Sequence, residues 1–126
     1  MVASYFNKIE KSIQQFSEII DNSTTSKRKY NDYQGLISGV ITFKDNSKLS
    51  FMEFFDLNVV DKVKYKYHYM SVENELTFRY DNAKHNPEIK TFPHHLHSNN
   101  RVMESTEPDL FDILNKVFDI LTTHKD

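Results

Sequence analysis

Histidine is the chemically active residue type that is most concentrated in this chain of 126 residues. Four of the six histidines, His85, His94, His95 and His97, lie within thirteen residues. In an extended segment His95 and His97 project to one side and His94 to the other. Imidazole titrates near neutral pH, so the group predicts general acid–base chemistry with His85, His95 and His97 as candidate catalytic residues.

A metal site is the alternative interpretation of the same histidines. His95 and His97 would bind a metal with His85 or Asp81 as third ligand, because imidazole and carboxylate together suit zinc, iron or nickel. No H-x-x-x-H pair is present, and the absence of cysteine excludes thiolate sites. A loop held by imidazole hydrogen bonds and prolines explains the histidines equally well. We therefore expect no cofactor.

Two charged residues could take part in the same chemistry. Arg79 alternates with Phe78 and Tyr80, so it faces away from them, where it would hold a phosphate or pair with a neighbouring acid. Glu53 falls among apolar residues of a predicted strand, where a carboxylate is costly. Either Glu53 reaches solvent at a twisted edge, or it serves as a catalytic acid or base or as a partner of Arg79 or a histidine.

The segment Lys64–Met70 alternates strictly and puts its three tyrosines on one face. Lys64, Lys66 and His68 line the other face, beside the predicted position of Arg79. A row of cations near tyrosine hydroxyls is typical of a surface for a nucleic-acid backbone. Solubility explains outward-facing lysines equally well.

Composition excludes several functions. The net charge of −2 does not indicate a nucleic-acid binder by itself. Neither a Gly-rich phosphate loop nor a G-x-S-x-G elbow occurs, which excludes P-loop and Rossmann chemistry. No apolar run approaches the roughly 20 residues of a membrane helix, and no secretory signal is visible. We expect a cytoplasmic protein with no membrane partner.

Hydrophobic periodicity predicts the elements that position these residues. A helix capped by Ser4 precedes a polar loop over 21–29, and a C-terminal helix begins at a Thr106 N-cap. Between them four strands are expected, over 36–43, 49–57, 64–70 and 75–80. The segment 81–100 is predicted to be irregular. The fold class is therefore α+β over 1–126, a single domain with a four-stranded antiparallel β-meander and both helices packed on one face.

Four runs of residues resemble the TumE-like toxin family of prokaryotic toxin–antitoxin loci. They are Tyr67-His68-Tyr69, Phe78-Arg79-Tyr80-Asp81-Asn82-Ala83-x-His85-x-Pro87-Glu88, Thr91-Phe92-Pro93-His94-His95-x-His97 and Glu104-Ser105-x-Glu107-Pro108. The resemblance implies a small toxin that is neutralised by a helix-turn-helix antitoxin, but it implies no particular reaction. It also implies that the motif residues belong to the site. With the residues above, the candidate substrate-binding set is Lys66, Tyr67, His68, Tyr69, Tyr80, Asp81 and His94.

Our first hypothesis is a metal-independent endoribonuclease. His95 or His97 would be the base, another histidine the acid and Arg79 the phosphate clamp, with Tyr67 and Tyr69 as base-stacking platforms. The second hypothesis is a non-catalytic metal- or ligand-binding module with a structural histidine loop. A toxin that modifies a nucleotide or a protein is a third, and a homodimer is left open.

Overall fold

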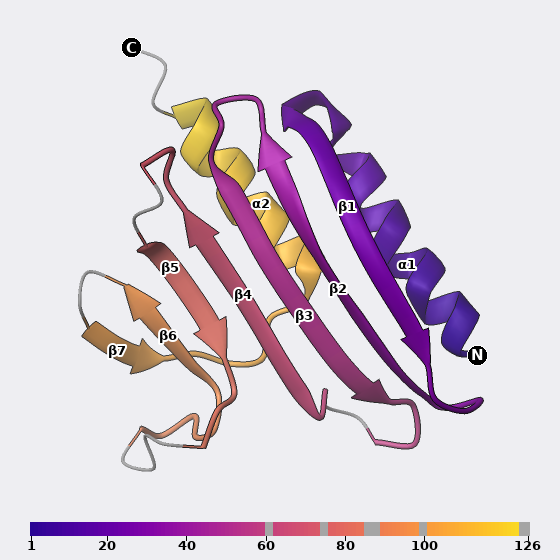
Figure 1. Ribbon diagram of the computed structural model, residues 1–126. Helices are drawn as coiled ribbons and strands as arrows, with labels where there is room; N and C mark the ends of the chain where they lie inside the picture. Colours follow the sequence, from indigo (N-terminus) through magenta and orange to yellow (C-terminus); the bar gives the residue numbers. More distant parts are fainter. Residues whose placement is uncertain (60–61, 74–75, 85–88, 99–100, 124–126) are drawn as a thin grey trace.

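The computed structural model describes residues 1–59, 62–73, 76–84, 89–98 and 101–123. Within these residues the strands form one seven-stranded antiparallel sheet in which every strand pairs with its neighbours in sequence (Figure 1). The elements are α1 (Val2–Gln15), a 3-10 turn (Ser17–Ile19), β1 (Ile20–Lys29), β2 (Gln34–Phe43), β3 (Lys48–Asp56), β4 (Lys64–Met70), β5 (Leu76–Asp81), β6 (His95–Ser98), β7 (Arg101–Glu104) and α2 (Leu110–Thr123).

The α+β class is confirmed, but the prediction of four strands is wrong. The polar segment expected to be a loop over 21–29 forms most of β1, which pairs with β2 along its length. All of these side chains are exposed, so the segment lacks the alternation that reveals a half-buried strand. Gly39 of β2 allows close approach here, because an added Cβ would lie 2.4 Å from the Thr24 carbonyl oxygen.

A second hairpin, formed by β6 and β7, lies where irregular structure was expected. Each of its strands has four residues, and β6 pairs with β5 on its other side. Histidine, serine, arginine and glutamate supply most of these eight residues, so neither hydrophobicity nor β propensity marks the hairpin in the sequence.

Both helices cover the same face of the sheet (Figure 1). Helix α1 buries Val2, Phe6, Ile9 and Ile13, and α2 buries Leu110, Ile113, Leu114 and Val117. These apolar stripes pack on the inward-facing residues of the central strands, which include Ile41, Phe51 and Tyr67. Neither helix in the described part of the chain is long and apolar enough to span a bilayer.

The helices begin at other residues than the sequence predicts. Met1, not Ser4, is the N-cap of α1. At α2 the Asp112 backbone N–H donates to Asp109 Oδ1 at 2.8 Å, and the Asp109 N–H donates to Asp112 Oδ2 at 3.1 Å. This reciprocal pair is a capping box. Asp109 therefore caps α2 in place of Thr106.

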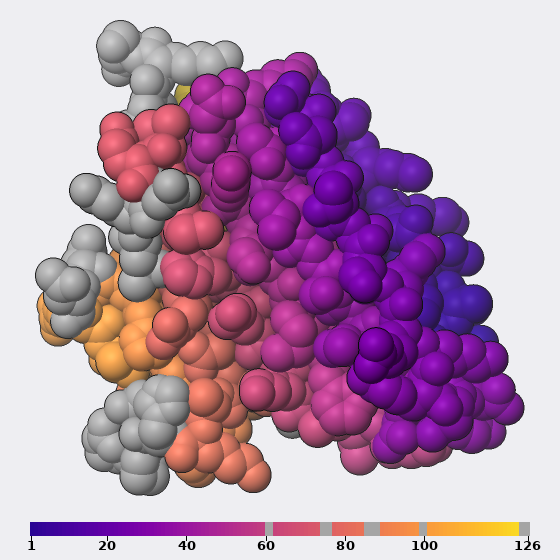
Figure 2. Space-filling model, in the orientation of Figure 1, coloured from indigo at the N-terminus to yellow at the C-terminus, as the bar shows by residue number. Residues whose placement is uncertain are grey.

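The face of the sheet that the helices leave uncovered carries the candidate chemistry. Strand alternation sends Tyr67 and Phe78 toward the helices, where both are buried, and His68 and Arg79 to the opposite side. We call this opposite side the open face. It is the face viewed in Figures 1 and 2, where the helices lie behind the sheet.

Candidate functional site

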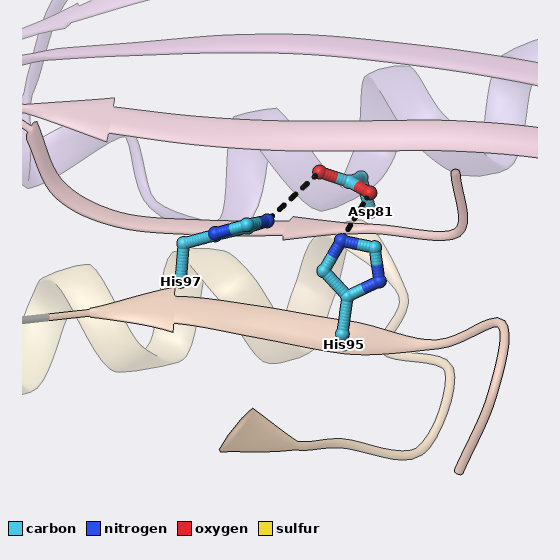
Figure 3. A group of neighbouring side chains, drawn as sticks. All are labelled: Asp81, His95 and His97. Atoms are coloured by element: carbon cyan, nitrogen blue, oxygen red, sulfur yellow. Dashed lines mark ion pairs between the residues drawn. The ribbon is translucent and has the colours of Figure 1, made fainter. Parts of the chain in front are cut away.

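Asp81, at the end of β5, is the centre of the candidate site (Figure 3). Its Oδ1 lies 2.8 Å from His95 Nε2 and accepts the Ala83 backbone N–H at 3.0 Å. Its Oδ2 accepts Arg79 Nε–H at 2.9 Å. Asp81 is only 6% exposed. Because both carboxylate oxygens are engaged within the protein, Asp81 positions its neighbours and is not placed to contact a substrate directly.

His95 is held from both sides of its ring. Nε2 faces Asp81, and Nδ1 lies 2.8 Å from the Pro93 carbonyl oxygen. A carbonyl oxygen only accepts, so Nδ1 donates this hydrogen bond. His95 is buried, at 1% exposure. It therefore fixes β6 against Asp81 and does not face a substrate.

His97 lies on the same side of β6 as His95, as the sequence predicts, but it is more accessible. Its Nε2 lies 3.1 Å from Arg79 Nη2 and 3.8 Å from Asp81 Oδ2. A guanidinium group only donates hydrogen bonds. Nε2 of His97 therefore accepts the hydrogen bond from Arg79, and the proton of this neutral imidazole is on Nδ1. A general base needs such a lone pair, which Arg79 occupies in this structure.

The register of the sheet adds His68 and Lys66 to the site. His68 is paired with Arg79, and Arg79 with His97, so the guanidinium lies in one cross-strand row between two imidazoles. Lys66 is paired with Asp81 in the adjacent row. Burial, followed by the charges of Arg79 and Lys66, lowers the pKa of His68 below its ordinary value.

Three of these residues could also serve as metal ligands. One donor atom from each of Asp81, His95 and His97 can be chosen so that all lie within 4.8 Å of one another. Two histidines and a carboxylate fit zinc, iron or nickel. In this structure, however, the Arg79 guanidinium contacts both Asp81 and His97, so a fixed cation already occupies part of the space between the donors. His85, the other predicted ligand, lies outside the described residues.

Glu53 is not part of this site. It is fully buried on the side of β3 that faces the helices, and it accepts hydrogen bonds from the Tyr5 and Tyr67 hydroxyls. Burial, with the Glu53 charge next, raises the pKa of Tyr67 well above its ordinary value. Glu53 therefore does not reach solvent at a strand edge, and its surroundings do not place it for catalysis in this site. Glu53 instead links α1, β3 and β4.

The predicted stacking role of Tyr67 and Tyr69 is also corrected by burial. Both rings lie in the core, at 0% and 3% exposure, and present no face to a base. Tyr80 lies on the helix side as well, where its hydroxyl accepts a hydrogen bond from Lys116 at 2.7 Å. The His94 ring stacks on Tyr65, and its Nδ1 lies 2.9 Å from the Tyr65 hydroxyl oxygen, away from the Asp81 cluster.

One group that shapes the site, the backbone carbonyl of Pro93, was not predicted from the sequence. The Pro93 carbonyl orients His95, and no side-chain pattern reports a backbone acceptor. The linking role of Asp81 was missed too. A strand register that pairs His95 with Asp81 would have revealed this role, but no residue pattern indicates β6.

The sequence model of the family described as Toxin TumE matches residues 9–124. The chain belongs to this family. Membership makes it a toxin of a toxin–antitoxin system, with an antitoxin as its partner. No curated protein and no solved structure matches the chain. The matched residues include the site residues His68, Arg79, Asp81, His95 and His97.

Proposed function

We propose that this toxin is a metal-independent endoribonuclease whose reacting groups are His97, Arg79 and His68. One observation carries the proposal, namely the row in which two imidazoles flank a guanidinium on the open face. Cleavage of RNA through its 2′-hydroxyl needs a base, an acid and a cation for the phosphate. The row offers all three in a surface accessible to a polymer.

His97 is the base in this proposal. Its Nε2 takes the proton of the 2′-hydroxyl as the 2′-oxygen forms a bond to the adjacent phosphorus. The bond from phosphorus to the 5′-oxygen breaks, which leaves a 2′,3′-cyclic phosphate. His68 gives its proton to the departing 5′-oxygen, so the proton count balances.

Arg79 and Asp81 change partners during this reaction. In the free protein Arg79 donates to His97; an RNA phosphate would draw the guanidinium away and leave Nε2 open to the 2′-hydroxyl. Once Nε2 is protonated, Asp81 Oδ2, now 3.8 Å away, stabilises the imidazolium. His95 holds Asp81 in place for this role.

The partner in this proposal is a helix-turn-helix antitoxin, and the target is cytoplasmic RNA. The test is growth of a bacterial host after induced expression of the wild type and of Arg79→Ala, with soluble protein measured in both strains. Growth arrest and new RNA 5′-hydroxyl ends only in the wild-type strain would support the proposal. An intact RNA pool in arrested cells would refute the ribonuclease function and leave the toxin.

The role of His68 makes a prediction for the pH profile. An acid must be protonated, and the pKa of His68 is lowered from 6.5. The descending limb of kcat/KM should therefore lie below pH 6.5, and activity should fall as the pH rises through that limb. His68→Gln should remove the limb and lower kcat by about 10²- to 10⁴-fold.

A modified substrate separates this role from a structural one. A 5′-bridging phosphorothioate releases a thiolate, which needs no proton because thiols are far stronger acids than alcohols. His68→Gln should cleave this substrate at nearly the wild-type rate, whereas His97→Ala should not. If both variants stay equally slow on the thio substrate, His68 is not the acid.

Metal binding without catalysis is the second candidate, and the donor group of Asp81, His95 and His97 favours it. Metal analysis of protein purified without a histidine tag decides between the two. Stoichiometric zinc or nickel that is lost on His97→Ala would favour the binding module. A metal-free protein that still cleaves RNA in EDTA would favour the ribonuclease.

A further inference from the structure

An aromatic side chain lies on the open face, outside the group of residues that forms the proposed site. Phe54 of β3 points away from the helices and is only half-buried. The ring of Tyr30, which is 50% exposed, meets it edge-on with centroids 5.8 Å apart. Aromatic rings on an exposed sheet face are otherwise unexpected, because apolar surface is normally directed into the core.

Basic residues flank this ring in the sheet. The register places Arg28, Leu36, Phe54 and Lys64 in one cross-strand row. Lys66, two residues along β4 from Lys64, lies in the next row beside Asp81. The row of Phe54 is therefore about 7 Å along the strands from the row of Asp81 and about 13 Å from the row of His68, Arg79 and His97. Strand β3 is two strands, or about 10 Å, from β5.

A hollow lies beside the ring, where β4 begins and β5 ends. Its volume is about 490 Å³, and its lining is Phe54, Val63, Lys64, Asn82, Ala83 and Lys84. Ala83 is the residue whose backbone N–H binds Asp81. The volume is within the range of small-ligand sites, and the lining combines apolar surface with two lysines.

The charge of the open face differs from that of the whole chain. Among the paired strand residues that face this side, five are basic, namely Arg28, Lys48, Lys64, Lys66 and Arg79. Three are acidic, namely Asp56, Asp81 and Glu104. The chain as a whole has a net charge of −2. An anionic polymer is therefore attracted to this face and not to the molecule generally.

We propose that Phe54, with Tyr30 supporting its ring, is a base-stacking subsite for single-stranded RNA, about 13 Å along the strands from the row that holds the scissile phosphate. The subsite rests on the proposed function, because it binds the same substrate. Arg28, Lys64 and Lys66 contact the phosphates along this path. Exposed aromatic rings interleaved with cations are the means by which proteins hold single strands without reading their sequence. A duplex has no free base face to offer, so the subsite selects single strands.

Binding is tested in an inactive His97→Ala background with a fluorescein-labelled single-stranded RNA of about ten nucleotides. Adding Phe54→Ala should raise Kd about 5- to 150-fold, because one stacked base contributes about 1–3 kcal/mol. Phe54→Leu keeps apolar bulk for folding and should weaken binding as well, whereas Phe54→Trp should retain it. Phe111→Ala, which removes an exposed ring from α2, is the matched control and should change nothing.

Two results would overturn the subsite. One is an unchanged Kd for folded Phe54→Ala and Phe54→Leu. The other is an equal loss of heparin binding and RNA binding in these variants. Heparin is a polyanion without bases, so this result would show that the face binds RNA by charge and not by base stacking. In the protein that retains His97, the cleavage rates of the wild type and of Phe54→Ala are compared. Equal rates would refute the subsite and leave the ribonuclease function. Phe54-dependent binding without cleavage by the wild type would refute the ribonuclease function alone.

Discussion

Replacing His97 by alanine is expected to lower kcat for RNA cleavage by about 10²- to 10⁴-fold, the usual contribution of a general base. The reason is the lone pair on Nε2, which the hydrogen bond from Arg79 identifies. Single-turnover cleavage of a labelled RNA measures the loss, and the Kd for the same RNA should stay within a few-fold of the wild type. The pH limb that reports the base should vanish from the residual activity.

His94→Ala is the control for this experiment. It removes an imidazole from the same short segment, but one that contacts Tyr65 and not Asp81. We expect cleavage by this variant to be close to that of the wild type. If His94→Ala is as slow as His97→Ala while both proteins remain folded, the base is wrongly assigned, and the histidine segment acts as a unit.

The second large effect is on stability and concerns Glu53. Glu53→Ala leaves the buried Tyr67 hydroxyl and the half-buried Tyr5 hydroxyl without their acceptor and creates a cavity, so the free energy of unfolding should fall by about 3–5 kcal/mol. Tyr5→Phe removes only one hydrogen bond to the carboxylate and should cost about 1.5–3 kcal/mol. Urea denaturation measures both losses.

Activity of the milder variant shows whether this cluster has a catalytic role. Tyr5→Phe should cleave RNA at the wild-type rate at temperatures where it is folded, because Glu53 lies on the helix side of the sheet and His97 on the other. The exposed Tyr33 provides a control, since Tyr33→Phe should leave stability unchanged. If Tyr5→Phe is fully folded but inactive, Glu53 has a role in catalysis after all.

The central strands could be predicted because they are buried on one face only. In Lys64–Met70 the alternation of tyrosine with polar residues reports that burial, and the structure has the same bounds. The strands at both edges of the sheet could not be predicted in this way. All residues of β1 after Ile20 are exposed, on both faces of the strand. The order of this strand therefore comes from backbone pairing, which leaves no pattern in the side chains.

Which residues form the site could largely be predicted from the sequence, but how they are arranged could be predicted only in part. The H-x-H spacing predicts that His95 and His97 share a side, and both approach Asp81. Their different exposure could not be predicted, because it depends on where β6 lies against β5. Glu53 shows the opposite case. A carboxylate among apolar residues indicates that a partner exists, but Tyr5 is 48 residues away in sequence, and only packing brings it near.

The hairpin of β6 and β7 is expected to be less stable locally than the core, and it carries part of the site. Its two strands have four residues each and end the sheet, while the helices pack mainly on the strands before them. Such a hairpin can open without unfolding the rest of the molecule. Opening would separate His95 and His97 from Asp81 and Arg79. Amide protons of Leu96 and Met103 should therefore exchange with deuterium well before those of Ile41 and Phe51. Catalytic competence would be lost at denaturant concentrations where the core is still intact.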